Sequence, residues 1–351
     1  MLRQARQEAA AVGREPPRTY YAAIVMDGDY MGKWLSGEKA PALRDVYHPR
    51  LVTAFEQLAS TASAEMHTTL DEKRPLTPVL HAAITAALGN FAHDCVPDIV
   101  ETTYRGELVY AGGDDVLALL PTRQALQCLS DLRDAYSGRG GTLYDTEIPR
   151  GWEVKEGRLL TLMGHTATAS AGLTIAHYKA DLRAVLEAAR NAEHAAKQAG
   201  RNALGIAVLR RSGEHPQVVC PWRFVPMLNR LVQAFVQGAS DRWTYHLHAD
   251  IETLACLENK AVTAEITRVV NRGDLASRRT LVSQLSANGL TDPAQAGATV
   301  ADYYRTFLDI LMERARDSHH NKTEIQEQAG KNFITLAQAA SFLARGRDEE
   351  R

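Results

Sequence analysis

The pattern of apolar and polar positions divides the chain into a first part that mixes strands with helices and a second part with helical spacing alone. In the first part, continuous apolar runs bounded by polar residues predict strands buried on both faces. These runs are residues 20–26, 107–111, 116–120, 167–176 and 203–209. Because a Gly-Gly-Asp-Asp turn at 112–115 joins two of them, they predict a β-hairpin, and residues 152–164 predict a second, smaller one.

Segments with apolar residues every three or four positions lie between these runs and predict helices. The expected helices are residues 48–66, opened by Pro49; 77–100, interrupted by Pro97; 122–136, with Thr122 as N-cap; and 181–200, ended by Gly200. This order of elements predicts an α+β fold in which helices cover a mainly antiparallel sheet. The ferredoxin-like palm belongs to this class.

From Arg211 onward the chain changes character, and no further strand is expected after about Val219. A linker at 212–222 is followed by helical periodicity in residues 225–237, 241–258, 260–270, 275–285, 301–317 and 322–344. The sequence therefore predicts three regions. They are a polar tail or helix at 1–18, an α+β domain at 19–210 of the class that includes the palm, and an all-α helical domain at 211–351.

Composition and charge narrow the class of protein. The chain has 351 residues, 45% of them hydrophobic, and a formal net charge of −2, which gives no general electrostatic attraction to nucleic acid or to an anionic membrane. The N-terminal segment is charged and lacks an apolar core, so neither a secretory signal nor a membrane anchor is expected. The 4 cysteines are far apart and form no zinc or disulfide framework, which favours a cytoplasmic location.

Two acidic points interrupt the predicted sheet. Asp27-Gly28-Asp29 follows the first strand, and Asp114-Asp115 lies in the hairpin turn. If these strands are neighbours, up to four carboxylates converge, and a divalent cation relieves their repulsion. Mg²⁺ prefers such oxygen ligands, and a pair of ions can hold the attacking and leaving oxygens of a phosphoryl displacement. Gly112 and Gly113 allow a tight turn and the close approach of a nucleotide.

Simpler explanations exist for these residues. Gly and Asp are both favoured in turns, so the hairpin turn alone needs no function. That explanation weakens because it does not account for a second acidic point at the end of another buried strand. Lys197 lies four residues after Glu193, a spacing that favours a surface ion pair over contact with a triphosphate.

Three motifs resemble a known family. They are MDGDYMGKWLSG at 26–37, VYAGGDDVLALLP at 109–121, and a long segment at 163–202 that ends in AEHAAKQAGRN. In this order they closely resemble the second palm domain of the large subunit of type III CRISPR effector complexes, Cmr branch. That palm is related to nucleotide cyclases of the GGDEF type. The resemblance covers about residues 20–209, and the helical remainder is consistent with the C-terminal helical domain of the same subunit.

The resemblance implies a nucleotidyltransferase that joins ATP into 3′–5′ cyclic oligoadenylates, second messengers of antiviral defence. A ribose 3′-hydroxyl would attack an α-phosphate and pyrophosphate would leave, at a two-metal site holding Mg²⁺ or Mn²⁺. The resemblance assigns catalytic and metal-binding roles to Asp27, Asp114 and Asp115, with Asp29 as a further metal ligand. It assigns nucleotide contacts to Gly28, Gly112, Gly113, Lys33, Ser36 and Lys197, so that Lys197 becomes a triphosphate contact.

The resemblance also implies partners: other CRISPR effector subunits, and guide and target RNA through the complex. The family's large subunit usually carries an HD nuclease domain, a first palm and a zinc-binding segment, which this sequence does not match. His93-Asp94 lies in a predicted apolar helix and is expected to be a satisfied polar pair. Because the first palm helps to hold the second ATP in the family, this palm is expected to need another palm-bearing chain or a second copy of itself.

Two other functions stay open. A GGDEF-like cyclase would use GTP, although Asp115-Val116 stands where those cyclases have Glu-Phe. A scaffold subunit of a CRISPR ribonucleoprotein would bind its neighbours without catalysis. His177, at the end of a predicted strand, is expected near the acidic residues as a nucleotide contact or a polar strand end, whereas 246–248 and 319–320 are expected to hold solvated histidines.

Overall fold

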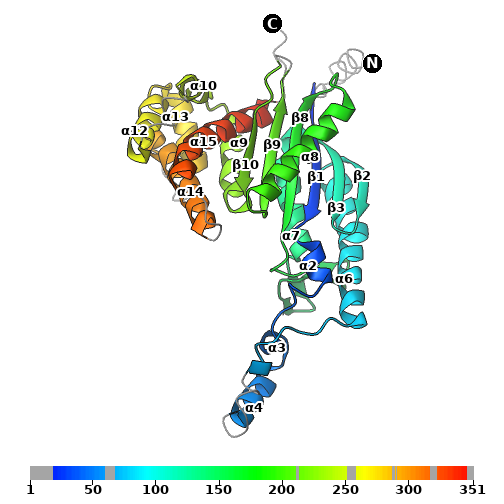
Figure 1. Ribbon diagram of the computed structural model, residues 1–351. Helices are drawn as coiled ribbons and strands as arrows, with labels where there is room; N and C mark the ends of the chain where they lie inside the picture. The colour runs from blue at the N-terminus through cyan, green and yellow to red at the C-terminus, as the bar shows by residue number, and fades with distance from the viewer. Residues whose placement is uncertain are drawn as a thin grey trace.

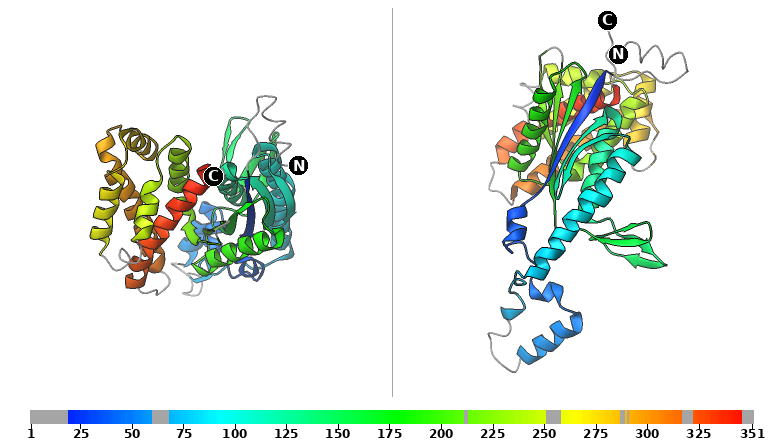
Figure 2. Two further views of the ribbon diagram at one scale, coloured as in Figure 1. Left: turned by 90° about the horizontal axis from the view of Figure 1, so that it is seen from above. Right: turned by 90° about the vertical axis from the view of Figure 1, so that its right-hand side faces the viewer.

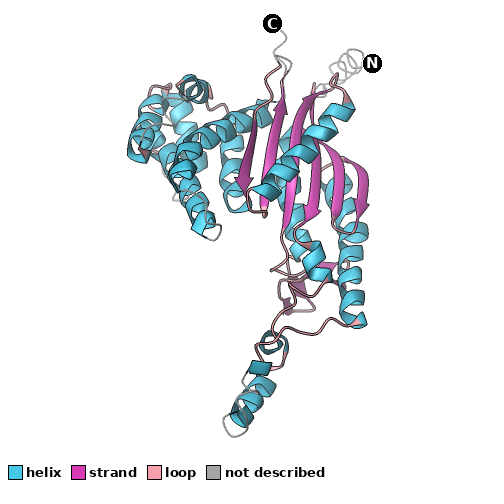
Figure 3. Cartoon of the chain, viewed as in Figure 1, coloured by secondary structure: helices cyan, strands magenta, loops and turns pink. Residues whose placement is uncertain are grey.

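A six-stranded sheet forms the centre of the computed structural model, which describes residues 19–59, 68–210, 213–250, 258–286, 289, 291–316 and 322–345. The strand order is β10-β9-β8-β1-β3-β2, seen in magenta in Figure 3. These strands are β1 (Tyr20–Gly28), β2 (Glu107–Gly112), β3 (Asp115–Pro121), β8 (Ala169–His177), β9 (Ala203–Leu209) and β10 (Gln217–Pro221). Two small hairpins lie outside the sheet: β4 (Gly141–Leu143) with β5 (Thr146–Ile148), and β6 (Trp152–Lys155) with β7 (Arg158–Thr161).

Four of these strands form a ferredoxin-like core. β1 is antiparallel to both β3 and β8, and β2 is antiparallel to β3. The order β8-β1-β3-β2 is the fourth-first-third-second arrangement of a β-α-β-β-α-β unit. A further crossover through α8 places β9 parallel to β8, and β10 then pairs antiparallel with β9. The predicted α+β palm with a mainly antiparallel sheet is confirmed.

Helices cover both faces of the sheet (Figure 1). Those of the palm region are α2 (Met31–Leu35), α3 (Leu43–Val46), α4 (Pro49–Ala59), α6 (Pro78–Asn90), the π-helical segments η1 (Phe91–Cys95) and η2 (Asp98–Thr103), α7 (Thr122–Ser137) and α8 (Leu182–Gln198). α7 packs against one face together with η1 and η2, and α8 packs against the other. β1 is therefore buried on both sides: Ile24 and Met26 belong to the large core, while Ala23 packs with Val185 of α8.

The C-terminal region is helical, as predicted, and lies beside β10 (Figure 1). Its helices are η3 (Trp222–Phe224), α9 (Val225–Val236), α10 (Arg242–Ala249), α12 (Asn259–Val270), α13 (Leu275–Leu285), η4 (Pro293–Gln295), α14 (Ala296–Arg316) and α15 (Lys322–Arg345). Phe224, Phe307 and Phe333 form edge-to-face and tilted ring contacts at its centre. Among the helices that the structure describes, none is long and apolar enough to cross a membrane.

Three local expectations were wrong. The segment expected as a linker contains β10, so the sheet continues past residue 210 and ends at Pro221. Thr122 is not an N-cap: Pro121 occupies that position, and Thr122 Oγ1 has no hydrogen-bond partner among the described residues. Pro97 does not interrupt its segment, because the wider π-helical turns on either side accommodate a residue without an N–H.

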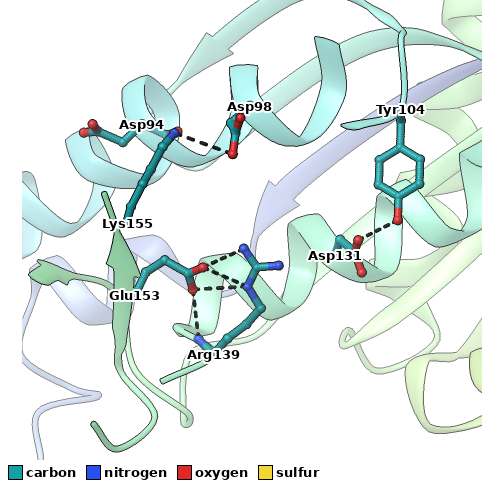
Figure 4. A network of polar contacts seen from close by, with 7 residues as sticks. All are labelled: Asp94, Asp98, Tyr104, Asp131, Arg139, Glu153 and Lys155. Atoms are coloured by element: carbon teal, nitrogen blue, oxygen red, sulfur yellow. Dashed lines mark hydrogen bonds and ion pairs between the residues drawn. The ribbon is translucent and has the colours of Figure 1, made fainter. Parts of the chain in front are cut away.

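Two segments project away from the sheet (Figure 2): α3 with α4, and the β6–β7 hairpin. The hairpin is fixed to the palm by charged side chains (Figure 4). Glu153 of β6 accepts hydrogen bonds from Arg139 Nε at 3.0 Å and Nη2 at 2.6 Å. Lys155 lies 3.7 Å from Asp98 and donates to the carbonyl of Asp94. Asp94, the acidic member of the expected polar pair, therefore helps to anchor this hairpin.

Candidate functional site

The two acidic points of the sequence meet at one end of the sheet. β1 and β3 are neighbours in antiparallel register, and Met26 pairs with Val116. The next positions, Asp27 and Asp115, therefore lie side by side where the strands end. Both lie one position beyond core-facing residues, so they face the side of the sheet covered by α8. The predicted convergence of these strands is confirmed.

Gly28 brings Asp114 against the end of β1. A Cβ atom at Gly28 would lie 2.5 Å from the hydroxyl of Tyr136 and 2.9 Å from the Cβ of Asp114. In the turn itself, Gly113 has φ +67°, a left-handed conformation that favours glycine. The close approach predicted for this turn thus depends on glycine at Gly28 as well as in the hairpin.

The two carboxylates of the hairpin turn carry an electrostatic cost. Burial raises the pKa of Asp114, and the neighbouring charge of Asp115 raises it further, while hydrogen bonds from the backbone of Asp114 and Gly28 oppose the shift. Burial also raises the pKa of Asp115. Raised pKa values mean that the ionised forms of both groups are disfavoured where they stand. A cation at this position would therefore be attracted to them.

Lys197 of α8 is the basic partner of this cluster. Its Nζ forms an ion pair with Asp27 and lies 2.8 Å from Glu193 Oε1. The pair expected from the spacing is present but largely buried, not at the surface, and the Asp27 contact brings Lys197 to the acidic site as well. Burial lowers the pKa of Lys197, and the charge of Arg201 lowers it further. Burial raises the pKa of Glu193 to about 7, with the negative charges of Asp29 and Asp115 adding to the shift.

Asp29 has a different set of partners from Asp27. It is 1% exposed, and its carboxylate accepts hydrogen bonds from Thr168 Oγ1 at 2.8 Å, Ser170 Oγ at 2.7 Å and the backbone N–H of Asn202 at 2.9 Å. A role for Asp29 in metal binding stays a prediction from the sequence. Its carboxylate oxygens are already engaged in joining β1, β8 and the start of β9.

Lys33 and Ser36 lie on and just after α2, the short helix that follows the acidic segment. Lys33 Nζ is 3.5 Å from Glu38 and half-exposed, and Ser36 Oγ donates to the Lys33 carbonyl at 3.3 Å. The structure thus places both at the surface beyond β1, and a phosphate contact for either stays a prediction. Gly112 pairs with Asp115 at the end of the hairpin, where a nucleotide contact likewise stays a prediction.

Sequence reasoning missed Tyr30 and Arg201. Tyr30 has φ +61°. The guanidinium of Arg201 lies over its ring, 4.2 Å from the ring centroid, and the ammonium of Lys39 lies 4.7 Å from the same centroid. Cations over an aromatic face are attracted by its quadrupole. The aromatic residue directly after Asp-Gly-Asp was the available signal, but its cationic partners are distant in the chain.

His177 is not part of this site. It pairs with Tyr20 at the start of β1, whereas Asp27 pairs with Ser170 at the other end of the same two strands. Its buried ring lies edge-to-face with Tyr20, with centroids 5.2 Å apart. The expectation of proximity to the acidic residues was therefore wrong. Of the remaining histidines, His319-His320 lie outside the described residues.

The donor set fits a hard divalent cation. Asp27, Asp114 and Asp115 offer only carboxylate oxygens, the ligands preferred by Mg²⁺ and Mn²⁺. Within the described ranges, however, His, Cys, Asp and Glu side chains form no group of three or more already spaced around an ion. Ion binding would therefore require Asp27 to exchange Lys197 for the cation.

Fold and site together define a class. A ferredoxin-like sheet with an acidic Gly-Gly-Asp-Asp hairpin beside an acidic first strand has the arrangement of a palm domain. Residues 20–205 match the family described as Cas10/Cmr2, second palm domain. The chain belongs to this family of large type III CRISPR subunits.

Individual relatives agree with this assignment. The "CRISPR system Cmr subunit Cmr2" of Pyrococcus furiosus is 31% identical over 245 residues, which cover 68% of this chain and 24% of that protein. A type III-B Cmr-beta structure bound to cognate target RNA matches 84% of this chain and 38% of its own chain, with a TM-score of 0.55 and 16% identity. The apo Cmr-beta structure gives a TM-score of 0.51 and 15% identity, covering 78% of this chain and 36% of that chain. This chain thus spans well under half the length of each relative.

Proposed function

We propose that this palm is a nucleotidyltransferase that converts ATP into 3′–5′ cyclic oligoadenylates. The observation that supports it best is the meeting of Asp27, Asp114-Asp115 and Lys197 at one end of the sheet. Such a site combines carboxylates for divalent cations with a cation for phosphate, which phosphoryl transfer requires. Membership of the Cas10/Cmr2 family supports the same reaction class.

Different residues of the chain would bind the metal ions, the triphosphate and the rest of the nucleotide. Asp27, Asp114 and Asp115 would hold one or two Mg²⁺ or Mn²⁺ ions, which supply charge neutralisation for the α-phosphate and the departing pyrophosphate. Lys197, released from Asp27, would bind the triphosphate as a point charge. Gly28, Gly112 and Gly113 would leave room for the nucleotide backbone to approach. Lys33 and Ser36 remain candidates for outer phosphate contacts, and Asp29 would hold the β1 end in place.

Joining two nucleotides requires a second ATP. The described residues contain one such acidic site, so the acceptor nucleotide would be held by a second palm, from another chain or from a second copy of this one. We propose that other CRISPR effector subunits, with guide and target RNA, are the wider partners. The Cmr-beta relative bound to target RNA supports this. A cytoplasmic location follows from such an assembly.

Labelled nucleotide tests this proposal. The full chain is incubated with ATP or GTP and Mg²⁺ or Mn²⁺, with and without target-bound effector complex, beside the Asp114→Ala/Asp115→Ala double variant. Adenylate oligomers with 3′–5′ linkages that disappear in the double variant are the expected result. Products from GTP alone would instead show a GGDEF-like cyclase. No product under any condition, with complex binding retained, would show a scaffold subunit.

A further inference from the structure

The loop between α8 and β9 has an unusual backbone. Three consecutive residues are left-handed: Gly200 with φ +98°, Arg201 with φ +62° and Asn202 with φ +44°. The left-handed region is unfavourable for residues with a Cβ atom, and it persists where surrounding contacts enforce it. Contacts from other segments of the chain therefore hold this loop in its conformation.

Arg314, near the end of α14 in the helical region, makes the most direct of these contacts. Its Nη1 donates to the carbonyl of Asn202 at 3.1 Å, and its Nη2 donates to the carbonyls of Ala199 at 2.9 Å and Arg201 at 2.6 Å. Burial lowers the pKa of Arg314, but an arginine remains charged in proteins. One guanidinium thus satisfies three carbonyls across the whole loop, a geometry that a lysine could not reproduce.

The same loop supports both sides of the acidic site. The N–H of Asn202 donates to Asp29 at 2.9 Å, which ties the loop to the end of β1. Arg201 lies over Tyr30, and Lys197 lies in the last turn of α8, directly before the loop. Gly200 N–H closes that turn by donating to the carbonyl of Lys197 at 3.3 Å. Displacing the loop would therefore shift the cations of the site relative to its carboxylates.

We propose that Arg314 is a positioning residue of the nucleotide site. Through the 199–202 loop, α14 sets the place of Lys197 beside Asp27 and of Arg201 over Tyr30. This inference rests on the proposed function, because that function assigns the binding of the triphosphate to Lys197. In this proposal the helical region supports the site indirectly. The contacts given for Arg314 are with backbone carbonyls of the loop and not with the carboxylates of the site.

Two measurements on the full chain test this inference, neither of which needs turnover. One is deuterium uptake by the segment 197–204, which contains the Asn202 amide. The other is the affinity for a fluorescent ATP analogue with Mg²⁺. Arg314→Ala is expected to raise the exchange rate of this segment and to weaken analogue binding by about tenfold each, because the loss of several charge-assisted hydrogen bonds amounts to a tenfold effect or more. Where turnover is measurable, KM for ATP should rise more than kcat falls.

A matched control removes Arg223 of η3, the ion-pair partner of the residue that precedes Arg314 on α14. Glu313 forms an exposed ion pair with Arg223, without a contact to the loop among the described interactions. Arg223→Ala should leave exchange and affinity unchanged. Arg314→Lys keeps the charge but reaches fewer carbonyls, so it should restore less than half of the lost affinity. Gly200→Ala supplies an independent perturbation, because its Cβ would lie 3.3 Å from Arg314 Nη2 at a left-handed position.

The outcomes separate this inference from the proposed function. If Arg314→Ala lowers the melting temperature while exchange of the segment and ATP affinity stay at wild-type values, the positioning role is wrong. Full recovery by Arg314→Lys would also overturn it, by showing that charge alone suffices. If the wild type binds the analogue and makes no adenylate product, the proposed function fails, while loop exchange and affinity still decide the role of Arg314.

Discussion

Asp27 and Asp29 are two residues apart, yet they have different partners: Asp27 forms an ion pair with Lys197, and Asp29 is enclosed by hydrogen-bond donors from β8 and the α8–β9 loop. The Asp27 carboxylate can exchange its partner for a cation, because Lys197 is the one side chain that pairs with it among the described residues. The other cannot leave without exposing three donors. This motif therefore separates the proposed chemical role of Asp27 from the structural role of Asp29.

Asp29→Asn should destabilise the protein by about 2–3 kcal/mol, because an amide cannot accept from three donors and one of them stays buried and unpaired. Chemical denaturation of the full chain measures this loss. Asp98→Asn, which removes an exposed carboxylate, is the control and should change stability by less than about 0.5 kcal/mol. Equal stability of the two variants would contradict a structural role for Asp29.

Asp114→Asn should affect activity and not lower stability, in contrast to Asp29→Asn. Removing a carboxylate whose pKa burial has raised should leave stability unchanged or increase it by up to about 1 kcal/mol. The same change should reduce the proposed nucleotidyl transfer by about a hundredfold or more, because it would remove a carboxylate from the proposed metal site. Product formation and denaturation are measured on the same preparation. A stable variant with wild-type turnover would exclude Asp114 from the reaction.

Lys197→Met tests the competition between lysine and metal for Asp27. Since Lys197 is ion-paired with Asp27, its removal should raise the affinity for Mn²⁺ by roughly tenfold while weakening ATP binding. Manganese binding is followed by electron paramagnetic resonance without nucleotide. Lys179→Met, at the opposite end of β8, is the charge control and should change neither affinity. Unchanged Mn²⁺ binding by Lys197→Met would show that Asp27 is not a metal ligand.

Gly28→Ala and Gly112→Ala should differ in their effect on turnover, although both glycines are proposed to face the nucleotide. A Cβ at Gly28 would meet the buried Tyr136 hydroxyl at 2.5 Å and the Cβ of Asp114 at 2.9 Å, so the hairpin turn must move and activity should fall by about a hundredfold. A Cβ at Gly112 would meet the side chain of Tyr110, which is 54% exposed and free to rotate. Turnover by the two variants, compared at equal folded fraction, checks the difference.

Glu193 should make stability depend on pH. Its pKa is about 7 in the folded protein and 4.5 in the reference state, so the folded state binds more protons between these values. Stability is then lost as pH rises from about 4.5 to 7, because the unfolded chain releases the proton first. Glu193→Gln should remove this component and raise stability at pH 8 by about 1–2 kcal/mol, after allowing for partial exposure to solvent. Parallel pH profiles of the two proteins would contradict a raised pKa.

The fold and the acidic cluster could be predicted from the sequence because their signals are local. Acidic residues follow one apolar strand and precede another, so they form a cluster as soon as these two strands are neighbours. The Gly-Gly-Asp-Asp hairpin joins β2 to β3 within a few residues. The spacing of Glu193 and Lys197 likewise fixes one helix face. These features follow from periodicity and turn chemistry alone.

The remaining features depend on contacts between distant segments. The partners of Asp29 come from Thr168, Ser170 and Asn202, and no spacing near Asp29 indicates them. Arg314 reaches its loop from more than a hundred residues away, as one of many arginines on helices. β10 was misread because Pro216 and Pro221 bound a run of only a few apolar residues, which is equally typical of a linker.

β10 has a practical consequence for work on isolated domains. It pairs along β9, whose residues from Ala203 to Val208 are almost fully buried and apolar. A fragment cut at residue 210, where composition changes, would keep every acidic residue of the site and still present β9 as a bare, flat edge strand. Such edges pair with one another between molecules. Fragments ending there should aggregate. A lack of activity in such a fragment would then result from aggregation and would not show that the acidic site is inactive.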